Sequence, residues 1–506
     1  MDLISGADIS WAISHIADPM VLLILIGGVT AGVLFGALPG ITGVAGIAIM
    51  TPLTFTMNFE HAMALLLGAY CGGYFGGSIP AILINVPGTP TNAATALDGY
   101  PMARQGDADK AIALAVLCSC IGGLFSALVL STLAPSLAKV ALQFNSAEYF
   151  GLAMLGLLCV AGVSGDSLLK GIAAAALGVG LSTIGVDPVG GTMRFTFDIS
   201  YLIAGIPIIP ALIGLFGITE MFTKTLEIES FKISVLPPQN KFRLRDIIPI
   251  FLRNKMVTFK GSLIGTFVGV LPGTGTAIAT WVSYGEATRS AKPGDIFGKG
   301  DPKGIIAAET ANNAVTGGAM VPLLTFGIPG DPVTAILIAA LLVQGIDPGP
   351  FFIAEYGNLF IFILLTLVLG NLFMVTIALS TRKLFRYFVK LRGDTLVPLI
   401  AVMSAAGAFS INNSTYEVML VVILGMVGYF MLKFGYPMAP IVLGIVLGPI
   451  VEDNLRNALA VSDMNPMVFI TRPISAGLIV VMAIMVGFWV YIKKRTGPNS
   501  DPADSS

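Results

Sequence analysis

The sequence predicts an all-α polytopic membrane protein with two inverted-topology repeats, broken helices and re-entrant-like hairpins. Of its 506 residues, 55% are hydrophobic and only 11% are charged, whereas a soluble domain carries about 25% charged residues. Apolar runs long enough to cross a bilayer recur along the whole chain. Pro-Gly motifs interrupt several of these runs and recur in the same order in the second half.

These patterns divide the chain into six predicted segments. In chain order they are an N-terminal outer segment (1–19), a first transmembrane repeat (20–223), a basic cytoplasmic linker (224–256), a second transmembrane repeat (257–474), an additional C-terminal transmembrane helix (475–495) and a disordered tail (496–506). The tail is small and polar, and such composition does not bury enough apolar surface to fold.

The first apolar run of each repeat contains a Leu-Pro-Gly break. Gly32–Gly40 matches Gly265–Gly273 at five of nine positions. Proline removes a backbone donor and clashes with the preceding helical turn. In a membrane this is tolerated only where the freed backbone is buried in protein or lines a cavity. Interrupted apolar segments at equivalent places in two halves indicate the substrate site of a secondary transporter.

Two further pieces repeat in the same order. Pro80 and 87–90 correspond to Pro322 and 329–332, and 207–214 corresponds to 437–444. Coincidence explains any one of these matches, but it explains all of them in sequence poorly.

The basic residues predict that the two repeats have opposite orientations. Residues 1–103 contain no Lys or Arg, whereas 224–260 contains eight. Because basic residues near span ends stay cytoplasmic, the first repeat starts outside and the second starts inside. We expect eleven crossings and two broken hairpins, with a periplasmic N-terminus and a cytoplasmic C-terminus.

A helix that restarts after Pro-Gly presents unpaired N–H groups and a positive dipole end, which suit a carboxylate. Glycine allows close approach and threonine adds a hydroxyl donor. The candidate substrate-binding residues are Pro39, Gly40, Thr42, Pro272, Gly273, Thr274, Gly275 and Thr276. Gly88, Thr89 and Asn92, at or just after the second Pro-Gly break of the first repeat (87–90), are further candidates. The alternative is that these breaks are only packing kinks, since Gly and Pro are common in membrane helices.

Carbonyl oxygens freed by the same breaks suit Na⁺, and Asn85 could add a side-chain oxygen. Glu309, Asn312 and Asn313 place a carboxylate and two amides on one apolar segment, and intramembrane ionisable groups are costly and usually functional. Glu309 is either a proton or cation site, or an interfacial group that is solvated or paired with Lys303. The two amides are otherwise interpreted as bonding into the hairpins.

Other function classes find little support. There is no G-x-x-x-x-G-K-[ST] motif, and two His residues do not provide a Ser-His-Asp arrangement or a metal-ligand set. A net charge of −1 gives no basic field for nucleic acid. The four cysteines lie in apolar segments and are interpreted as buried free thiols. We therefore expect neither an enzyme nor a cofactor other than a coupling ion.

Several long motifs resemble the large membrane subunit of the tripartite tricarboxylate transporter family. They are 72–89, 97–101, 297–300, 309–314 and 327–330, and the resemblance extends over roughly residues 15 to 495. It implies a multi-pass transporter of the bacterial inner membrane that works with a small transmembrane subunit and a periplasmic solute-binding protein. Uptake of carboxylates, such as citrate, other tri- and dicarboxylates and aromatic acids, is then coupled to Na⁺ or protons by alternating access.

Asp331 departs from the family pattern, because a small neutral residue is more usual after this Pro-Gly. A carboxylate so near a dipole-based anion site repels an anionic substrate unless it binds a cation, so Asp331 joins the cation-binding candidates. An ion or anion channel, which also uses broken helices, and a non-transporting receptor or scaffold are the alternative functions. The sequence leaves a homo-oligomer open.

Overall fold

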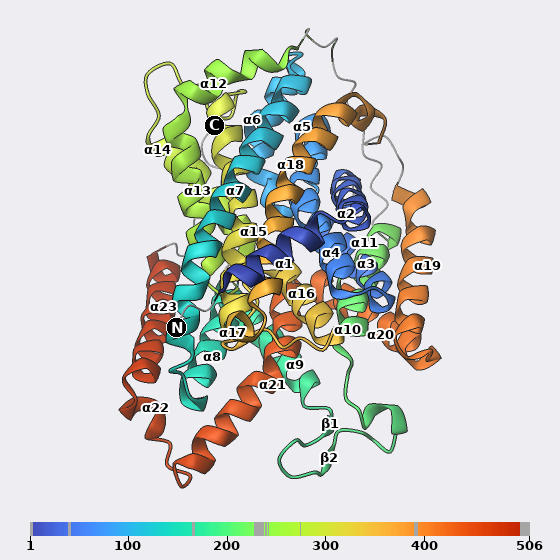
Figure 1. Cartoon of the computed structure of the whole chain (residues 1–506), viewed down its shortest axis with the longest axis vertical. Coiled ribbons are helices and arrows are strands. Elements are labelled where there is room, and N and C mark those ends of the chain that lie inside the picture. Colours follow the sequence, from blue (N-terminus) through green and yellow to red (C-terminus); the bar gives the residue numbers. More distant parts are fainter. Residues whose placement is uncertain are drawn as a thin grey trace.

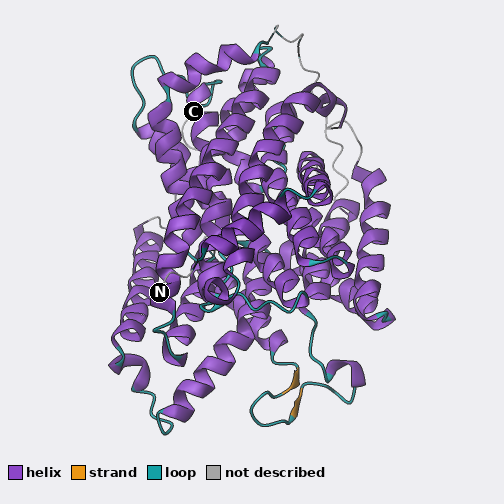
Figure 2. Ribbon diagram, viewed as in Figure 1, coloured by secondary structure: helices purple, strands orange, loops and turns teal. Residues whose placement is uncertain are grey.

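Within the residues that it describes, the structure is helical except for one two-stranded hairpin (Figure 2). This computed structural model describes residues 4–38, 42–163, 167–226, 237, 240, 242–273, 275–388 and 393–495.

The first half of the chain contains α1 (Gly6–Ile16), α2 (Pro19–Ala37), α3 (Gly43–Met50), η1 (Thr51–Thr56), α4 (Phe59–Gly76), α5 (Ser78–Ile84), η2 (Pro90–Asn92), α6 (Ala93–Arg104), α7 (Ala108–Ala141), α8 (Ser146–Val163), α9 (Leu168–Ser182), β1 (Gly185–Val186), β2 (Met193–Arg194), η3 (Ser200–Leu202), α10 (Ile208–Leu212), the π-helix η4 (Ile213–Ile218) and α11 (Thr219–Leu226).

The second half contains η5 (Leu244–Asp246), α12 (Ile247–Arg253), α13 (Lys255–Val270), α14 (Gly275–Arg289), α15 (Pro302–Phe326), α16 (Pro332–Val343), α17 (Phe352–Glu355), α18 (Gly357–Phe388), α19 (Gly393–Asn412), α20 (Thr415–Lys433), α21 (Met438–Val461), α22 (Val468–Thr471) and α23 (Pro473–Arg495).

Six helical stretches among the described residues are long and apolar enough to cross a membrane, and several shorter apolar helices accompany them. The six are Pro19–Ala37, Phe59–Ile84, Ala108–Ala141, Gly357–Phe385, Thr415–Lys433 and Met438–Val461. The predicted class, an all-α polytopic membrane protein, is confirmed.

The helices break where the Pro-Gly motifs stand. Helix α13 ends at Val270 and α14 starts at Gly275, while Gly273 between them has a left-handed φ of 74°. Helix α15 ends at Phe326 and α16 starts at Pro332. In the first repeat α2 ends at Ala37 and α3 starts at Gly43, but Pro39 and Gly40 lie outside the described residues.

Repeat-matched glycines have the same packing role in both halves. A Cβ added at Gly32 on α2 would lie 2.3 Å from the carbonyl oxygen of Ala69 on α4, and one at Gly265 on α13 would lie 2.3 Å from that of Ala311 on α15. The absence of a side chain lets each helix pair cross backbone to backbone. The α2–α4 and α13–α15 pairs are therefore equivalent.

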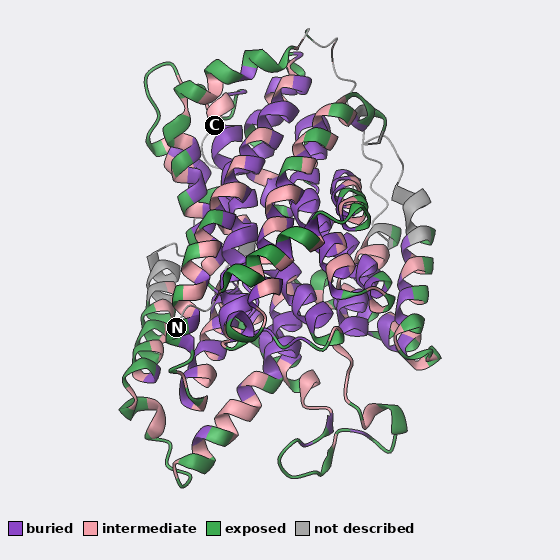
Figure 3. Ribbon diagram, in the orientation of Figure 1, coloured by how far each residue is buried: buried purple, intermediate pink, exposed green. Residues whose placement is uncertain are grey.

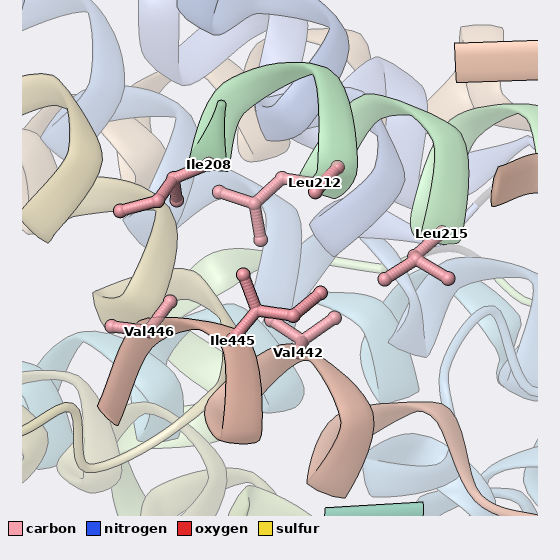
Figure 4. A pocket seen from close by; sticks show the side chains of 7 residues that line it. Ile208, Leu212, Leu215, Val442, Ile445 and Val446 are labelled. Atoms are coloured by element: carbon pink, nitrogen blue, oxygen red, sulfur yellow. The ribbon is translucent and has the colours of Figure 1, made fainter. Parts of the chain in front are cut away.

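The matched segments 207–214 and 437–444 each pack against a helix of the opposite half. A Cβ at Gly214 in η4 would lie 2.7 Å from the Val421 carbonyl oxygen of α20, and one at Gly444 in α21 would lie 2.4 Å from the Ala175 carbonyl oxygen of α9. The two matched segments also face each other across a small gap lined only by apolar side chains, as Figure 4 shows. That gap offers nothing to hold a carboxylate.

The two halves run in opposite directions where their equivalent helices meet. Asn312 of α15 donates to the Tyr74 carbonyl of α4, and Ser78, further along the first half, bonds to Glu309, which is earlier in α15. Residue numbers increase along the α4–α5 segment in the direction in which they decrease along α15, so the two segments are antiparallel. This antiparallel meeting is what an inverted repeat requires, and the membrane orientation remains a prediction.

Helices α13 and α14 form a hairpin that returns to its starting level. Lys260 Nζ near the start of α13 lies 2.7 Å from Glu286 Oε1 near the end of α14. A Cβ at Gly261 would lie 3.2 Å from Ser283 Oγ. The hairpin is therefore re-entrant in shape, with its Pro-Gly tip pointing into the protein.

Burial is concentrated around α4, α7 and α15 at the centre of the molecule (Figures 1 and 3). Every residue of α15 from Gly304 to Thr325 is buried. Polar side chains placed on this helix must find partners inside the protein, because an unpaired buried polar group is costly.

The β1–β2 hairpin projects from one end of the molecule (Figure 1) and is tied to α21 by ion pairs. Arg194 Nη1 lies 2.5 Å from Glu452 Oε1, and Arg456 Nη1 lies 2.9 Å from Asp187 Oδ1. The Val189 backbone N–H and then the Arg456 guanidinium lower the pKa of Asp187.

Candidate functional site

Glu309 is the carboxylate at the centre of the molecule. It is 0% exposed, and its oxygens accept hydrogen bonds from hydroxyls on three other elements. Ser78 Oγ of α5 lies 2.6 Å from Oε1, Ser119 Oγ of α7 lies 2.9 Å from Oε2, and Thr95 of α6 also donates to Oε1. Lys303 pairs with Asp295 instead. Glu309 is therefore neither solvent-exposed nor paired with Lys303, and its role as a proton or cation site stays a prediction.

Two buried amides continue this network. Asn92 Nδ2 donates to Ser78 Oγ at 2.8 Å and to the Tyr74 carbonyl at 3.2 Å. Asn312 Nδ2 donates to the same carbonyl at 3.0 Å, while its Oδ1, also buried, has no hydrogen-bond partner. The carbonyl of Tyr74 therefore joins Asn92, near the 87–90 break, to one of the cation candidates, Asn312.

The turn of the second break bonds mainly to itself. Thr89 Oγ1 donates to Asn92 Oδ1 at 2.5 Å and lies 2.6 Å from Thr91 Oγ1. The Gly88 N–H donates to the Gly77 carbonyl at 3.1 Å. The Gly88 N–H, the Thr89 hydroxyl and the Asn92 amide are thus engaged by groups of the chain itself, and Asn92 reaches Glu309 through Ser78.

Asp331 forms a second buried carboxylate site. As the N-cap of α16 it accepts from the Thr334 backbone N–H at 2.7 Å. Its other oxygen accepts from the hydroxyls of Tyr70 at 2.6 Å and Tyr74 at 2.7 Å. The positive end of α16 is consequently occupied by the chain's own carboxylate, which gives the unusual Asp331 a structural function.

The start of α3 is occupied in the same way. The Thr42 N–H donates to Glu220 Oε1 at 2.8 Å, and its hydroxyl lies 3.2 Å from Glu220 Oε2. Thr42 also caps α3 through the Ala45 N–H at 3.1 Å. The carboxylate at this helix start is the side chain of Glu220 from α11, and binding of a substrate carboxylate by Thr42 stays a prediction.

The Pro272-Gly273 tip between α13 and α14 lies against the Pro329-Gly330 break between α15 and α16. The Gly273 N–H donates to the Gly330 carbonyl at 3.0 Å. Pro272 and Gly273 are buried, as is Thr276, whose side chain interacts with the Tyr74 hydroxyl. Gly275 begins α14, and Thr274 lies outside the described residues. No carboxylate among the described residues is hydrogen-bonded to the first turn of α14.

Two cation candidates lie apart from Glu309. Asn85 is exposed in a left-handed conformation at the end of α5. Asn313 points to α18, where its Nδ2 lies 3.5 Å from Asn371 Oδ1. The structure therefore brings together Glu309, Asn312 and the second break, and separately Asp331 and the α14 tip, with Tyr74 contacting both groups.

Several site residues were not predicted from the sequence. Tyr74 and Ser78 stand within one of the recognised motifs, but hydroxyls in an apolar run give no signal of their own. Tyr70, Thr95 and Ser119 carry no motif that would have singled them out.

Asp98 connects two of the recognised motifs. Its Oδ1 accepts from the backbone N–H groups of Gly300 at 3.0 Å and Asp301 at 2.8 Å. The Tyr284 hydroxyl donates to Oδ2 at 2.8 Å. Asp98 thereby holds the loop that precedes α15 against α6 and α14.

An all-helical membrane protein whose broken helices surround buried carboxylates and hydroxyls has the architecture of a membrane transport protein. The chain belongs to the tripartite tricarboxylate transporter TctA family, whose family model matches residues 22–443. Members of this family are the large subunit of a transporter and are not enzymes. Membership implies partnership with the other components of a tripartite system.

Two relatives from Agrobacterium vitis are similar to this chain. One, an uncharacterized 52.8 kDa protein in the TAR-I ttuC' 3' region, is 37% identical over 481 residues, which is 95% of each chain. The other, an uncharacterized protein in the TAR-II ttuC' 3' region, is 37% identical over 215 residues, which is 42% of this chain and 89% of the relative. No solved structure matches.

Proposed function

We propose that the chain is the membrane-spanning path of a binding-protein-dependent secondary transporter that imports carboxylates by cation-coupled alternating access. A periplasmic solute-binding protein delivers a tricarboxylate or a related di- or monocarboxylate, and a small transmembrane subunit completes the complex in the bacterial inner membrane. The observation that carries the proposal is the pair of broken helices at equivalent positions in two antiparallel halves.

The start of α14 is the carboxylate-binding position that the contacts favour. The starts of α3 and α16 already hold Glu220 and Asp331. The first turn of α14 follows the Pro272-Gly273 tip and lies beside the Tyr74 hydroxyl. Its remaining N–H groups, its dipole and the Thr276 hydroxyl suit an anion without any buried guanidinium. An anion held this way is released more easily than one paired with Arg.

Reconstitution with both partner components tests this function. Proteoliposomes that contain the chain and its small subunit receive the binding protein and a radiolabelled carboxylate that stabilises that binding protein. Wild-type uptake should require all three components. The Gly273→Ala variant should lose at least about tenfold in uptake, because a left-handed conformation costs about 1–2 kcal/mol for a residue with a Cβ. The added Cβ would also lie 1.8 Å from Val160 Cγ2.

Gly285 on α14 gives the matched control, since a Cβ there meets nothing within 4 Å. Gly285→Ala should transport like wild type. Wild-type uptake by Gly273→Ala would remove the tip from the substrate path. No uptake with all three components present would instead favour a receptor or scaffold.

A further inference from the structure

The buried carboxylate of Glu309 has no positively charged partner among the residues that the structure describes. The elements packed against α15 include α4, α6, α7, α13, α14 and α16. Their described basic residues stand within two turns of a helix end and include Lys110, Lys260 and Lys303, which pair with Asp107, Glu286 and Asp295. The other titratable groups on these elements are the imidazole of His61 in the first turn of α4, the thiols Cys71, Cys118 and Cys120, the phenols Tyr70, Tyr74, Tyr100 and Tyr284, and acidic residues such as Asp98 and Asp331. A buried charge with only neutral partners is costly, so the ionised form of Glu309 needs a cation from solution.

Asn312 provides a second, independent sign of a missing ligand. Among the described residues its Oδ1 is buried without a hydrogen-bond partner, although its Nδ2 donates to the Tyr74 carbonyl. Asn313 Oδ1 also lacks a partner, but the Asn313 amide faces α18. Asn312 follows Glu309 by three residues, so both side chains lie on the same face of α15. Buried polar atoms are almost always satisfied in native proteins. An acceptor oxygen without a donor, one turn along the same face of α15 from a carboxylate without a cation, is consistent with one positive ligand that serves both.

The oxygen atoms at this place favour Na⁺ over a proton. A proton bound to Glu309 supplies a single O–H donor, whereas carboxylate, amide and hydroxyl oxygens of four helices come together here. A metal cation is bound by several oxygens at once, and carboxylate, amide carbonyl and hydroxyl oxygens are the ligands that hard cations prefer. Ser78, Thr95 and Ser119 surround the carboxylate with hydroxyl oxygens from three elements.

We propose that Glu309 and Asn312, with the hydroxyls of Ser78, Thr95 and Ser119, form a binding site for Na⁺, the ion whose gradient drives uptake. The proposal rests on the proposed transport function for its driving role but not for the binding itself. The site connects α5, α6 and α7 of the first half to α15 of the second.

The position of Tyr74 links this cation site to the carboxylate-binding tip. Its carbonyl accepts from Asn92 and Asn312 beside Glu309, while its hydroxyl contacts Asp331 and Thr276. A cation that orders Asn312 and Ser78 therefore also fixes the α4 segment that borders the start of α14. This shared segment is how Na⁺ binding favours carboxylate binding.

Thermal denaturation of the purified chain with its small subunit in detergent tests the site with Na⁺ alone. Wild-type protein is titrated with NaCl at constant ionic strength against choline chloride. The midpoint of unfolding should rise with Na⁺ concentration and saturate, because a ligand that binds only the folded state stabilises it. Glu309→Gln and Asn312→Ala should both lose this Na⁺-dependent rise.

Asn313→Ala is the matched control, since Asn313 is a buried amide on the same helix that faces α18. It should keep the wild-type Na⁺ response. Ser119→Ala removes a single hydroxyl and should shift the titration to higher Na⁺ concentration; it also serves if Glu309→Gln does not fold. An unchanged Na⁺ response in Asn312→Ala and Ser119→Ala would overturn the site.

The outcomes separate this inference from the transport function. Carboxylate uptake by the reconstituted system without any Na⁺ effect on the wild-type midpoint would refute the Na⁺ site and leave the function intact. A midpoint that responds to pH, but not to Na⁺, and only when Glu309 is present would assign a proton and also refute it. A Na⁺ response that depends on Glu309, without carboxylate uptake, would retain the site and refute the function.

Discussion

At the scale of single residues, the absence of a side chain determines how the central helices cross. Gly27 and Gly28 are neighbours on α2 in very different surroundings. A Cβ at Gly28 would lie 2.3 Å from the Leu65 carbonyl oxygen of α4, whereas one at Gly27 meets nothing within 4 Å. Sequence alone does not distinguish these two glycines.

We therefore predict opposite outcomes for two adjacent alanine substitutions. Gly28→Ala should destabilise the protein by about 1–3 kcal/mol, because the α4 backbone cannot move aside without cost. Gly27→Ala should be neutral or stabilise by up to about 1 kcal/mol, since alanine favours the helix. Thermal denaturation of the two variants in the same detergent measures the difference. Equal effects would mean that α2 and α4 do not cross this closely.

Other residue-scale features were predictable only in part. Glu309 and Asn312 could be identified because a carboxylate and amides within an apolar segment are unusual. Ser78, Thr95 and Ser119 could not, because hydroxyls occur throughout apolar helices and only the fold shows which of them point to Glu309. Thr42 was predicted to bind a substrate carboxylate, and this stays a prediction. Its partner in the structure, Glu220, lies 178 residues away along the chain, a separation over which sequence patterns give no pairing.

At the scale of elements, the Pro-Gly motifs predicted where helices break but not what fills the breaks. Asp331 caps α16 and accepts from two tyrosines of α4. Asp331 therefore links α16 of the second half to α4 of the first half. From the sequence, Asp331 was interpreted as a cation-binding candidate, because it lies near the positive end of a helix and the two tyrosine hydroxyls could not be foreseen.

Removing the Asp331 side chain should lower the free energy of unfolding more than removing an ordinary helix cap does. Asp331→Ala removes the acceptor that the Tyr70 and Tyr74 hydroxyls share and also the cap of α16. We expect a loss of at least about 3 kcal/mol, from about 1–3 kcal/mol for each buried group left unsatisfied and about 0.5–2 kcal/mol for the cap. Asp18→Ala is the control, because exposed Asp18 caps α2 through the Met20 N–H alone. It should cost about 0.5–2 kcal/mol. Similar losses in the two variants, measured by thermal denaturation, would argue against the link between α4 and α16.

At the scale of the whole molecule, the repeat was predictable because its anchors are prolines and glycines that serve the same backbone geometry twice. The paired crossings of α2 with α4 and α13 with α15 bear this out at Gly32 and Gly265. The predicted division into six segments is a separate matter. Of the basic linker at 224–256, residues 227–236, 238, 239 and 241 lie outside the described residues, and its last part forms η5, α12 and the start of α13.

Labelling of single introduced cysteines tests the predicted orientation of the two repeats in the membrane. Ser10 and Arg245 are both exposed, and the four native cysteines are buried, so Ser10→Cys and Arg245→Cys should label without background. In intact cells a membrane-impermeant thiol reagent should reach residue 10 but not residue 245, which should label only after permeabilisation. Labelling of both positions from the same side would contradict the opposite starts of the two repeats.

The central claim is that two antiparallel, broken-helix halves couple carboxylate movement to a cation gradient. Its most direct test is the ratio of internal to external radiolabelled carboxylate at steady state in proteoliposomes that hold the complete transporter. We predict that the ratio rises well above one only when an inward cation gradient is imposed, and that it returns to one when an ionophore collapses the gradient. Equilibration to the same ratio with and without a gradient would contradict the claim and identify a channel.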